Sequence, residues 1–318
     1  MPANSVYAAA HFALELDDKQ EVSLFRSIEG GGVKADVMTY QYGNHDKNDA
    51  YLRYRSLGKP KFDDIKLQLG MSMSVGFYLW MQGFFRGIAA RRNGAILAAD
   101  FYYKERARRT FTNAMISELT FPKLDGSDKN PVYMNVTLSV EEVAFEQGSG
   151  KALPIQSKGY YDQKHWASNN FEFSIAGFEQ ACKRVTKVDS FTIKQKVMEH
   201  HVGGQKAAIK VPSQIEFPNL TFYVPEADAY PFMRHMEERV GFGKDIGKGQ
   251  VRDEPGLHGT IQTFDNELKP LFEVTFTGGD ILSVTPDKAD AGSEDVKLVK
   301  IEMYVERMAF KYEDLEPE

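Results

Sequence analysis

Residues 132–145, VYMNVTLSVEEVAF, alternate apolar and polar side chains over most of their length. The apolar positions of this alternation are Val132, Met134, Val136, Leu138 and Val140. A period of two residues is typical of a strand with one buried face. Similar patterns, or a β-branched and aromatic composition, predict further strands at 11–16, 22–28, 33–40, 62–70, 94–102 and 109–121.

The end of this stretch returns in the second half of the chain. Val140-Glu-Glu-Val-Ala-Phe145-Glu is matched by Val305-Glu-Arg-Met-Ala-Phe310-Lys. Further matches in the same order are Phe12 with Phe171, Ile65 with Leu220, Phe77 with Phe232, Met81 with Met236, and Phe111 with Phe276. We therefore expect one module written twice, as domain 1 (residues 1–148), a linker (149–165) and domain 2 (166–318).

One segment in each copy breaks the period of two. Ala227–Val240 repeats a helical spacing seen in Ser74–Ala90, whose apolar positions are Phe77, Trp80, Met81, Phe84 and Phe85. The predicted fold class is mainly β with one helix per domain, arranged as two tandem β-barrel or β-sandwich domains. The aromatic stripe of the first helix favours packing against the barrel over a ligand pocket.

The composition is that of an ordinary globular chain. Of 318 residues, 42% are hydrophobic and 26% are charged, which excludes a disordered, collagenous or disulfide-rich protein. The length favours two domains. We expect no membrane span, because no apolar stretch approaches the roughly 18 residues required, and no secretory signal. The single cysteine, Cys182, excludes an intramolecular disulfide.

The charge is unevenly distributed. Residues 1–158 carry a net charge of +2 and residues 159–318 a net charge of −8. Neither half is basic enough to predict a nucleic-acid-binding domain.

No catalytic constellation emerges from the sequence. The adjacent His200 and His201 would point to opposite faces of a strand, and no histidine spacing matches a metal motif. The stretch 241–250, GFGKDIGKGQ, fails as a phosphate-binding loop because Gly249 stands where Ser or Thr should follow Lys248. Cys182 has no sequence signal for a histidine partner. We predict no cofactor, no metal and no enzymatic activity.

The order of several short segments in the first copy resembles the tail-tube protein family of contractile phages and injection systems. The fold of this family is shared with the type VI secretion tube protein. The segments that carry the resemblance are Tyr40-Gln-Tyr42-Gly43, Leu57-Gly58-Lys59-Pro60-Lys61-Phe62, the helix with Trp80, Arg91-Arg92-Asn93-Gly94, Phe111-Thr112-Asn113-Ala114, Phe121-Pro122-Lys123 and Val143-Ala144-Phe145-Glu146. The resemblance covers about residues 8–148, and the second copy, about 167–314, matches more loosely.

The resemblance implies a structural subunit of the inner tail tube, built from stacked hexameric rings. Because each chain would carry two domains, we expect a homotrimer with the appearance of a hexamer. The resemblance also implies a stacking loop between rings at Tyr42–Lys61. Its candidate residues are Tyr42, His45, Tyr51, Arg53, Tyr54, Arg55 and Lys59, and the candidates for helix packing and ring contacts are Phe77, Trp80, Met81, Phe232 and Met236.

The implied partners are further copies of the chain, a sheath protein, and baseplate or hub and terminator proteins. DNA or protein payload would pass through the lumen without sequence-specific binding, and the acidic second half would line that lumen. The particle would assemble in the bacterial cytoplasm and act in a virion tail or injection particle. A hub-adaptor or tube-initiator ring, a tube-terminator ring and, from another class, a β-sandwich glycan-binding module stay open as alternatives.

Overall fold

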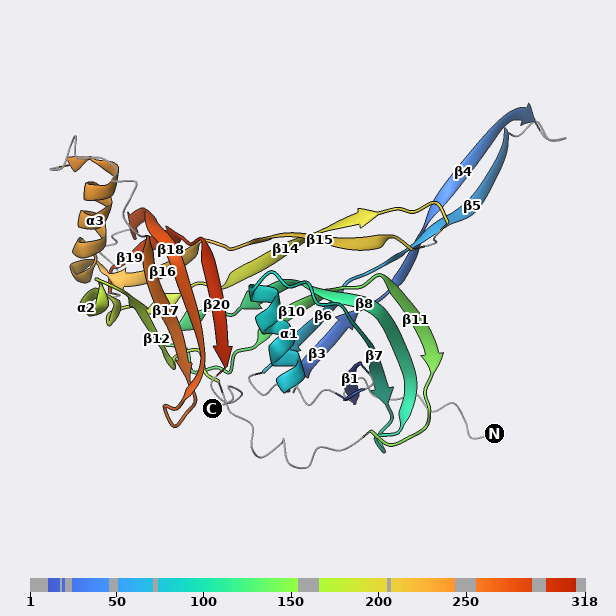
Figure 1. Ribbon diagram of the computed structural model, residues 1–318, viewed down its shortest axis with the longest axis horizontal. Helices are drawn as coiled ribbons and strands as arrows, with labels where there is room; N and C mark the ends of the chain where they lie inside the picture. Colours follow the sequence, from blue (N-terminus) through green and yellow to red (C-terminus); the bar gives the residue numbers. More distant parts are fainter. Residues whose placement is uncertain are drawn as a thin grey trace.

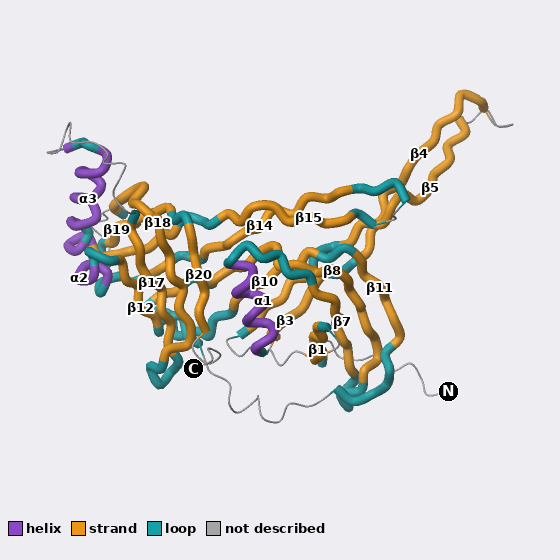
Figure 2. The backbone as a smooth tube through the Cα atoms, viewed as in Figure 1, coloured by secondary structure: helices purple, strands orange, loops and turns teal. Residues whose placement is uncertain are grey.

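The chain forms two β-sheets side by side, from which two long hairpins extend (Figure 1). This computed structural model describes residues 11–17, 19–20, 25–45, 51–70, 74–153, 166–204, 207–243, 256–287 and 296–312. Strands dominate in both halves, as Figure 2 shows, so the mainly β fold predicted from the sequence is confirmed. Within the described residues, no helix has the length and apolar character needed to cross a membrane.

Among the described residues, the first half contains eleven strands and one helix. They are β1 (Phe12–Leu16), β2 (Lys19–Gln20), β3 (Phe25–Gly30), β4 (Val33–His45), β5 (Tyr51–Phe62), β6 (Ile65–Leu69), α1 (Val75–Phe85), β7 (Arg92–Ala99), β8 (Glu105–Phe121), β9 (Leu124–Asp125), β10 (Met134–Ser139) and β11 (Glu142–Gln147).

The second half follows a similar order. Its elements are β12 (Phe171–Ile175), α2 (Glu179–Cys182), β13 (Lys187–Val188), β14 (Phe191–His200), β15 (Ile209–Glu216), β16 (Leu220–Pro225), the 3-10 helix η1 (Glu226–Asp228), α3 (Tyr230–Val240), β17 (Leu257–Phe264), β18 (Pro270–Pro286), β19 (Leu298–Tyr304) and β20 (Arg307–Tyr312). The short helix α2 is additional to the one helix per domain expected from the sequence.

The strand order is the same in the two sheets for most of their width. The first sheet runs β2-β1-β7-β8-β10-β6-β3 and the second runs β12-β17-β18-β19-β16-β13-β9. Two strands cross between the halves: β14 of the second half pairs with β8, and β9 of the first half pairs with β13. Strand pairing therefore joins the two halves of the chain directly, since each sheet contains strands from both.

The residue registers also correspond. Gly94 pairs with Phe111 between β7 and β8, and Gly259 pairs with Phe276 between β17 and β18. A Cβ atom at either glycine would lie 2.6 Å from the ring of its paired phenylalanine. Only glycine leaves room for these rings, which explains the residue at both positions.

The core lies between the sheets and the helices. Leu14 and Leu16 in β1 are buried, as are Phe173 and Ile175 in β12, so the alternation seen in the sequence marks the inner faces. Helix α1 begins at the N-cap Ser74, whose hydroxyl accepts a hydrogen bond from the Phe77 backbone N–H. It ends at Phe85, earlier than the predicted Ala90.

The prediction of a loop at Tyr42–Lys61 is wrong for most of this segment. Most of it belongs to the antiparallel hairpin of β4 and β5, which form their own two-stranded sheet. The sequence pattern conceals these strands because described residues on both faces of the ribbon, such as Tyr40, Gln41 and Tyr54, are exposed. A strand that is wet on both faces has no alternation to detect.

Candidate assembly surfaces

The junction between the halves contains a pair of strand ends. Residues 191–194 of β14 pair with residues 121–118 of β8. Phe121 and Phe191 stack with their ring centroids 4.9 Å apart. The hydroxyls of Thr120 and Thr192 lie 2.9 Å apart. Ile193, at the centre of this strand pair, has no exposed surface.

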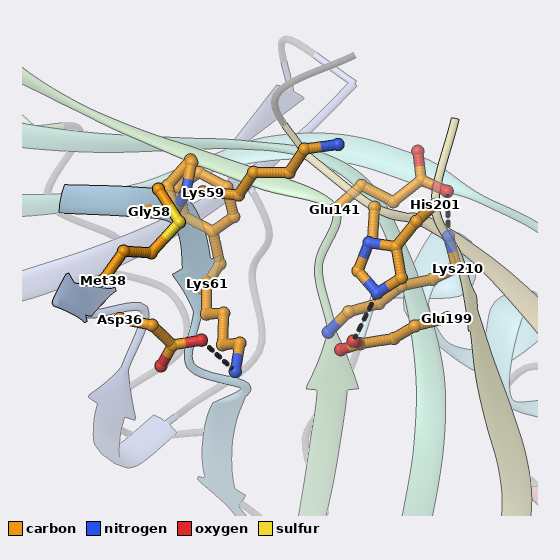
Figure 3. Close-up of a pocket in the computed structure, with 12 residues that line it drawn as sticks. Asp36, Met38, Gly58, Lys59, Lys61, Glu141, Glu199, His201 and Lys210 are labelled. Atoms are coloured by element: carbon orange, nitrogen blue, oxygen red, sulfur yellow. Dashed lines mark hydrogen bonds and ion pairs between the residues drawn. The ribbon is translucent and has the colours of Figure 1, made fainter. Parts of the chain in front are cut away.

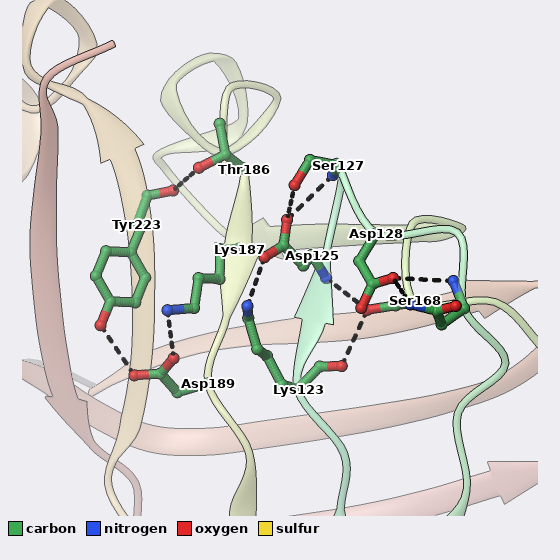
Figure 4. A network of polar contacts seen from close by, with 10 residues as sticks. Lys123, Asp125, Ser127, Asp128, Ser168, Thr186, Lys187, Asp189 and Tyr223 are labelled. Carbon is green, nitrogen blue, oxygen red and sulfur yellow. Dashed lines mark hydrogen bonds and ion pairs between the residues drawn. The ribbon is translucent and has the colours of Figure 1, made fainter. Parts of the chain in front are cut away.

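A polar network surrounds the second strand pair of the junction, β9 with β13 (Figure 4). Lys123 Nζ lies 2.6 Å from the Asp125 carboxylate. Hydrogen bonds from Lys123 and then from Ser127 lower the pKa of Asp125 to about 2. Across the pair, Tyr223 donates its hydroxyl proton to Asp189 at 3.0 Å. Burial, and secondarily this bond, raises the pKa of Tyr223 to about 12.

The hairpin β14–β15 lies over the first half (Figure 1) and is fixed there by Lys210. The Lys210 Nζ atom donates to Asp64 at 3.2 Å and to Ser139 at 2.9 Å. Its backbone N–H donates to Glu141 at 2.8 Å, and Arg91 lies 3.3 Å from the same carboxylate. The lysine is buried, and its charge is satisfied by groups of the first half.

Helix α1 covers β20 of the second half. The rings of Phe85 and Phe310 stack at 5.9 Å between centroids. Tyr78 lies 6.0 Å from Phe310, and its hydroxyl accepts a hydrogen bond from the Tyr312 backbone N–H at 3.4 Å. Phe310 is 2% exposed as a result. We call the four contact sets at β8–β14, β9–β13, Lys210 and α1–β20 the covered junction.

The hairpin β4–β5 carries the predicted stacking residues. Arg53, Tyr54, Arg55 and Lys59 are exposed on β5. Lys59 Nζ reaches the Val202 carbonyl oxygen at 3.5 Å. The side chains of the other candidates lie outside the described residues; these are Tyr42, His45 and Tyr51. The structure thus places the described candidates on one projecting ribbon, and their contact with another ring stays a prediction.

The predicted helix residues mostly lie in the interior of the chain. Phe77, Trp80, Met81 and Phe232 are buried, and Met236 is partly buried against the same core. They therefore pack the helices onto their own sheets. A contact of these residues with another subunit stays a prediction.

A cavity of about 350 Å³ lies between the two hairpins. Its polar lining includes Asp36, Lys61, Glu199, His201 and Lys210, as Figure 3 shows. Lys61 and Asp36 are paired at 2.7 Å, and their hydrogen bond raises the pKa of Lys61. These exposed opposite charges compensate each other and present no arrangement of nucleophile and base.

Other candidate chemistry is also lacking in the described part of the chain. No group of three or more His, Cys, Asp or Glu residues there could hold a metal ion. Cys182 is buried, and burial raises the pKa of its thiol to about 11. The thiolate that a nucleophile requires is therefore disfavoured.

The sequence analysis missed the residues that join the halves. Lys210 carried no signal, because a lone lysine in a strand is ordinarily exposed. Phe145 and Phe310 were recognised as matching positions of the repeat, and nothing in their context indicated that one is covered and the other is not. Tyr78 lies outside the predicted stripe of α1, and its burial gives the helix a second buried side.

The comparisons with known proteins concern mainly the first half of the chain. Residues 8–144 match the family model of the T4-like virus tail tube protein gp19. This part of the chain therefore matches the tail tube family, and the resemblance predicted from its segments is confirmed. The matched family is a structural family of tail tubes and not an enzyme family. No curated protein sequence matches the chain.

Several solved structures are similar to part of the chain. One is the sheath–tube complex of an extracellular contractile injection system, PVC, in its extended state. It is 16% identical, with 46% of this chain and 94% of that chain covered and a TM-score of 0.38. The sheath/tube terminator of the PVC system is 16% identical, with 45% and 99% covered and a TM-score of 0.37. Hcp1 from Flavobacterium johnsoniae is 16% identical, with 43% and 95% covered and a TM-score of 0.25.

Proposed function

We propose that the chain is a subunit of the inner tube of a contractile tail or injection system, in which three two-domain chains close a ring with six lobes. The covered junction carries this proposal. It joins the two halves by antiparallel strand pairing, a mode of association that an unpaired strand edge can repeat with another chain. Repeating the same step from chain to chain would generate a closed ring through heterologous contacts.

The proposal requires that the halves are copies of one module, with domain 1 at residues 1–148, a linker at 149–165 and domain 2 at 166–318. Matched irregularities support this. The pairing of β10 with β8 shifts between Thr137 and Leu138, and the pairing of β18 with β19 shifts between Ile281 and Ser283 at the corresponding place. Bulges of this kind are specific local features, so their repetition favours a duplicated module.

Matching hairpins give further support. The register of β4 with β5 shifts between Ala35 and Val37, and that of β14 with β15 shifts between Gln195 and Val197. Both shifts lie near the base of a hairpin that leaves its sheet. The two hairpins are therefore counterparts in the proposed repeat, and they differ in length.

In this role the outside of the ring would contact the sheath, and the lumen would pass DNA or protein without reading its sequence. The unequal hairpins favour a second candidate, a hub-adaptor or initiator ring. Alternation of a long and a short hairpin around the ring would present a threefold pattern on a six-lobed body. Such a ring suits the join between a threefold component and a sixfold tube.

Negative-stain microscopy of the purified chain, combined with light scattering, tests the proposal. Rings of three chains with six lobes that stack into long tubes would support the main-tube role. Trimeric rings that never stack would favour the adaptor or a terminator. A monomer at every concentration would overturn ring formation and favour the glycan-binding alternative.

A further inference from the structure

We propose that two copies of the chain bind each other by a second version of the covered junction. In it, the face formed by α3 and the end of β18 in one copy packs against β4, β5 and β11 of the next. We call the surface of α3 and β18 the donor face, and the surface of β4, β5 and β11 the acceptor face. The inference rests on the proposed ring, and it names the residues through which the ring closes.

The first argument concerns the strand ends. Leu119 of β8 and Val284 of β18 hold corresponding places, because they pair with Val136 and Ile301 in matching registers. Leu119, which pairs with Ile193 of β14, is fully buried, whereas Val284 is partly exposed. In the described part of the chain, residues 283–286 pair with β19 on one side and with no strand on the other. The donor face thus has an open strand edge at the position that corresponds to the pairing of β8 with β14.

The acceptor face offers the complementary strand. Val33 lies two residues before the register shift of β4, as Ile193 does in β14. Ile193 is fully buried by its pairing with β8, while Val33 is 44% exposed. An exposed valine at the start of an edge strand is the feature expected of a surface that another strand covers.

The second argument concerns the helices. Phe145 of β11 and Phe310 of β20 are counterparts, since β11 pairs with β8 as β20 pairs with β18. Phe310 is 2% exposed under α1, and Phe145 is 62% exposed. On the donor face, Val240 ends α3 as Phe85 ends α1, and it is 61% exposed where Phe85 is 7% exposed. A helix of one copy over β11 of the next would cover both apolar residues.

The third argument concerns charge. In the covered junction, Lys210 of β15 donates its backbone N–H to Glu141 of the first half. The matching registers place Arg55 of β5 at the position of Lys210 and Glu306 at the position of Glu141. Both residues are exposed, and their charges are opposite. The second junction therefore sets a carboxylate against the same strand position as in the first, with the opposite charge of Arg55 beside it.

These correspondences fix a register for the contact. Val284 of one copy lies opposite Val33 of the next, and Ser283 lies opposite Lys34, in antiparallel strands. Cα atoms of directly opposed residues are about 4.5 to 5.5 Å apart, which is within disulfide range. Cys182 is buried and does not compete for an engineered bond.

Cysteine pairing tests this register. The double variant Val33→Cys/Val284→Cys, oxidised in the full-length chain, is expected to yield linked dimers and trimers on a non-reducing gel. The matched control, Lys34→Cys/Val284→Cys, places the two thiols on opposite faces of the strands and is expected to lose at least tenfold in linked product. Equal yields from the two variants would overturn the register.

Charge reversal supplies an independent readout by light scattering. Arg55→Glu and Glu306→Arg are each expected to weaken association at least tenfold, and the double variant to recover most of the loss. Rings that form normally in both single variants, without cross-linking at residues 33 and 284, would overturn this interface and leave the proposed ring intact. Failure of the unmodified chain to associate would instead contradict the ring itself.

Discussion

Helices α1 and α3 hold corresponding places in the two halves, but their surroundings differ. Helix α1 has six buried residues, Phe77, Tyr78, Trp80, Met81, Phe84 and Phe85. In α3 only Phe232 is buried. The difference arises because α1 lies between the two sheets, against β20, while α3 lies at the end of the chain's sheet pair (Figure 1).

The sequences of the helices follow this difference. Helix α1 contains no charged residue, whereas α3 carries an ion pair of Arg234 with Glu238 at 2.8 Å. A permanently covered surface can be as apolar as a core, but a surface that is wet before assembly needs charges for solubility. The covered junction thus resembles a domain core, and its open counterpart resembles an interface that forms later.

The test with the largest expected effect on stability is a matched pair of substitutions by alanine. Phe310→Ala removes a buried ring that packs against Tyr78 and Phe85, and we expect it to lower the free energy of unfolding by about 3–5 kcal/mol. Phe145→Ala removes its exposed counterpart, with an expected change below about 0.5 kcal/mol in the dissociated chain. Denaturant unfolding at low protein concentration measures both. Similar losses in the two variants would remove the distinction between covered and open junctions.

A second test uses positions whose surroundings are the same in both halves. Gly94→Ala and Gly259→Ala would each force a Cβ atom against a phenylalanine ring at 2.6 Å. We expect each to cost about 1–3 kcal/mol through overpacking, and the two costs to be alike. Thermal unfolding of both variants provides the measurement. A large inequality would argue against equivalent sheets.

A third test compares the two hairpins. Lys210→Met keeps the aliphatic stem but leaves Asp64 and Ser139 without their buried partner, at an expected cost of about 1–2 kcal/mol. Arg55→Met, at the exposed counterpart, is expected to change the dissociated chain by less than about 0.5 kcal/mol. Unfolding midpoints in denaturant, taken with the fold verified by circular dichroism, distinguish the two. If Arg55→Met proved the more damaging, the correspondence of the hairpins would be wrong.

The sequence was informative where one face of a strand is buried. The alternation around Val136 predicted β10, and the match of residues 140–146 with 305–311 lies in strands β11 and β20, which have corresponding pairings. Period two reports burial on one side, so it identifies strands in sheets with a core.

The sequence was less informative where burial depends on distant segments. The described residues of the hairpin β4–β5 show no buried face that would set a pattern, so residues 42–61 were taken for a loop. Lys210 is covered only because β15 crosses to the other half, a consequence of topology that no local pattern contains. The same holds for the strand pairs β8–β14 and β9–β13, which depend on the relative placement of the two sheets.

The smallest expected effect is a pH dependence within the covered junction. Hydrogen bonds from Lys123 and Ser127 hold the pKa of Asp125 at about 2, below its ordinary value of 3.8. A carboxylate with a lowered pKa stabilises the folded state above its ordinary pKa, and this stabilisation is lost as the pH falls from about 4 to about 2. Because Lys123 is 47% exposed and screened by solvent, we expect a contribution of only about 1 kcal/mol.

The variant Asp125→Asn isolates this contribution. Its unfolding free energy is expected to fall below that of the unmodified chain at pH 6 and to approach it at pH 2. Asp128→Asn, in the same turn, controls for the loss of one negative charge there. If the unfolding free energy of Asp125→Asn stays equally far below that of the unmodified chain at pH 2, the residue acts through its shape and not through its ionised form. In that case the polar network at β9 would contribute to the covered junction by packing alone, as the aromatic contacts at α1 and β20 do.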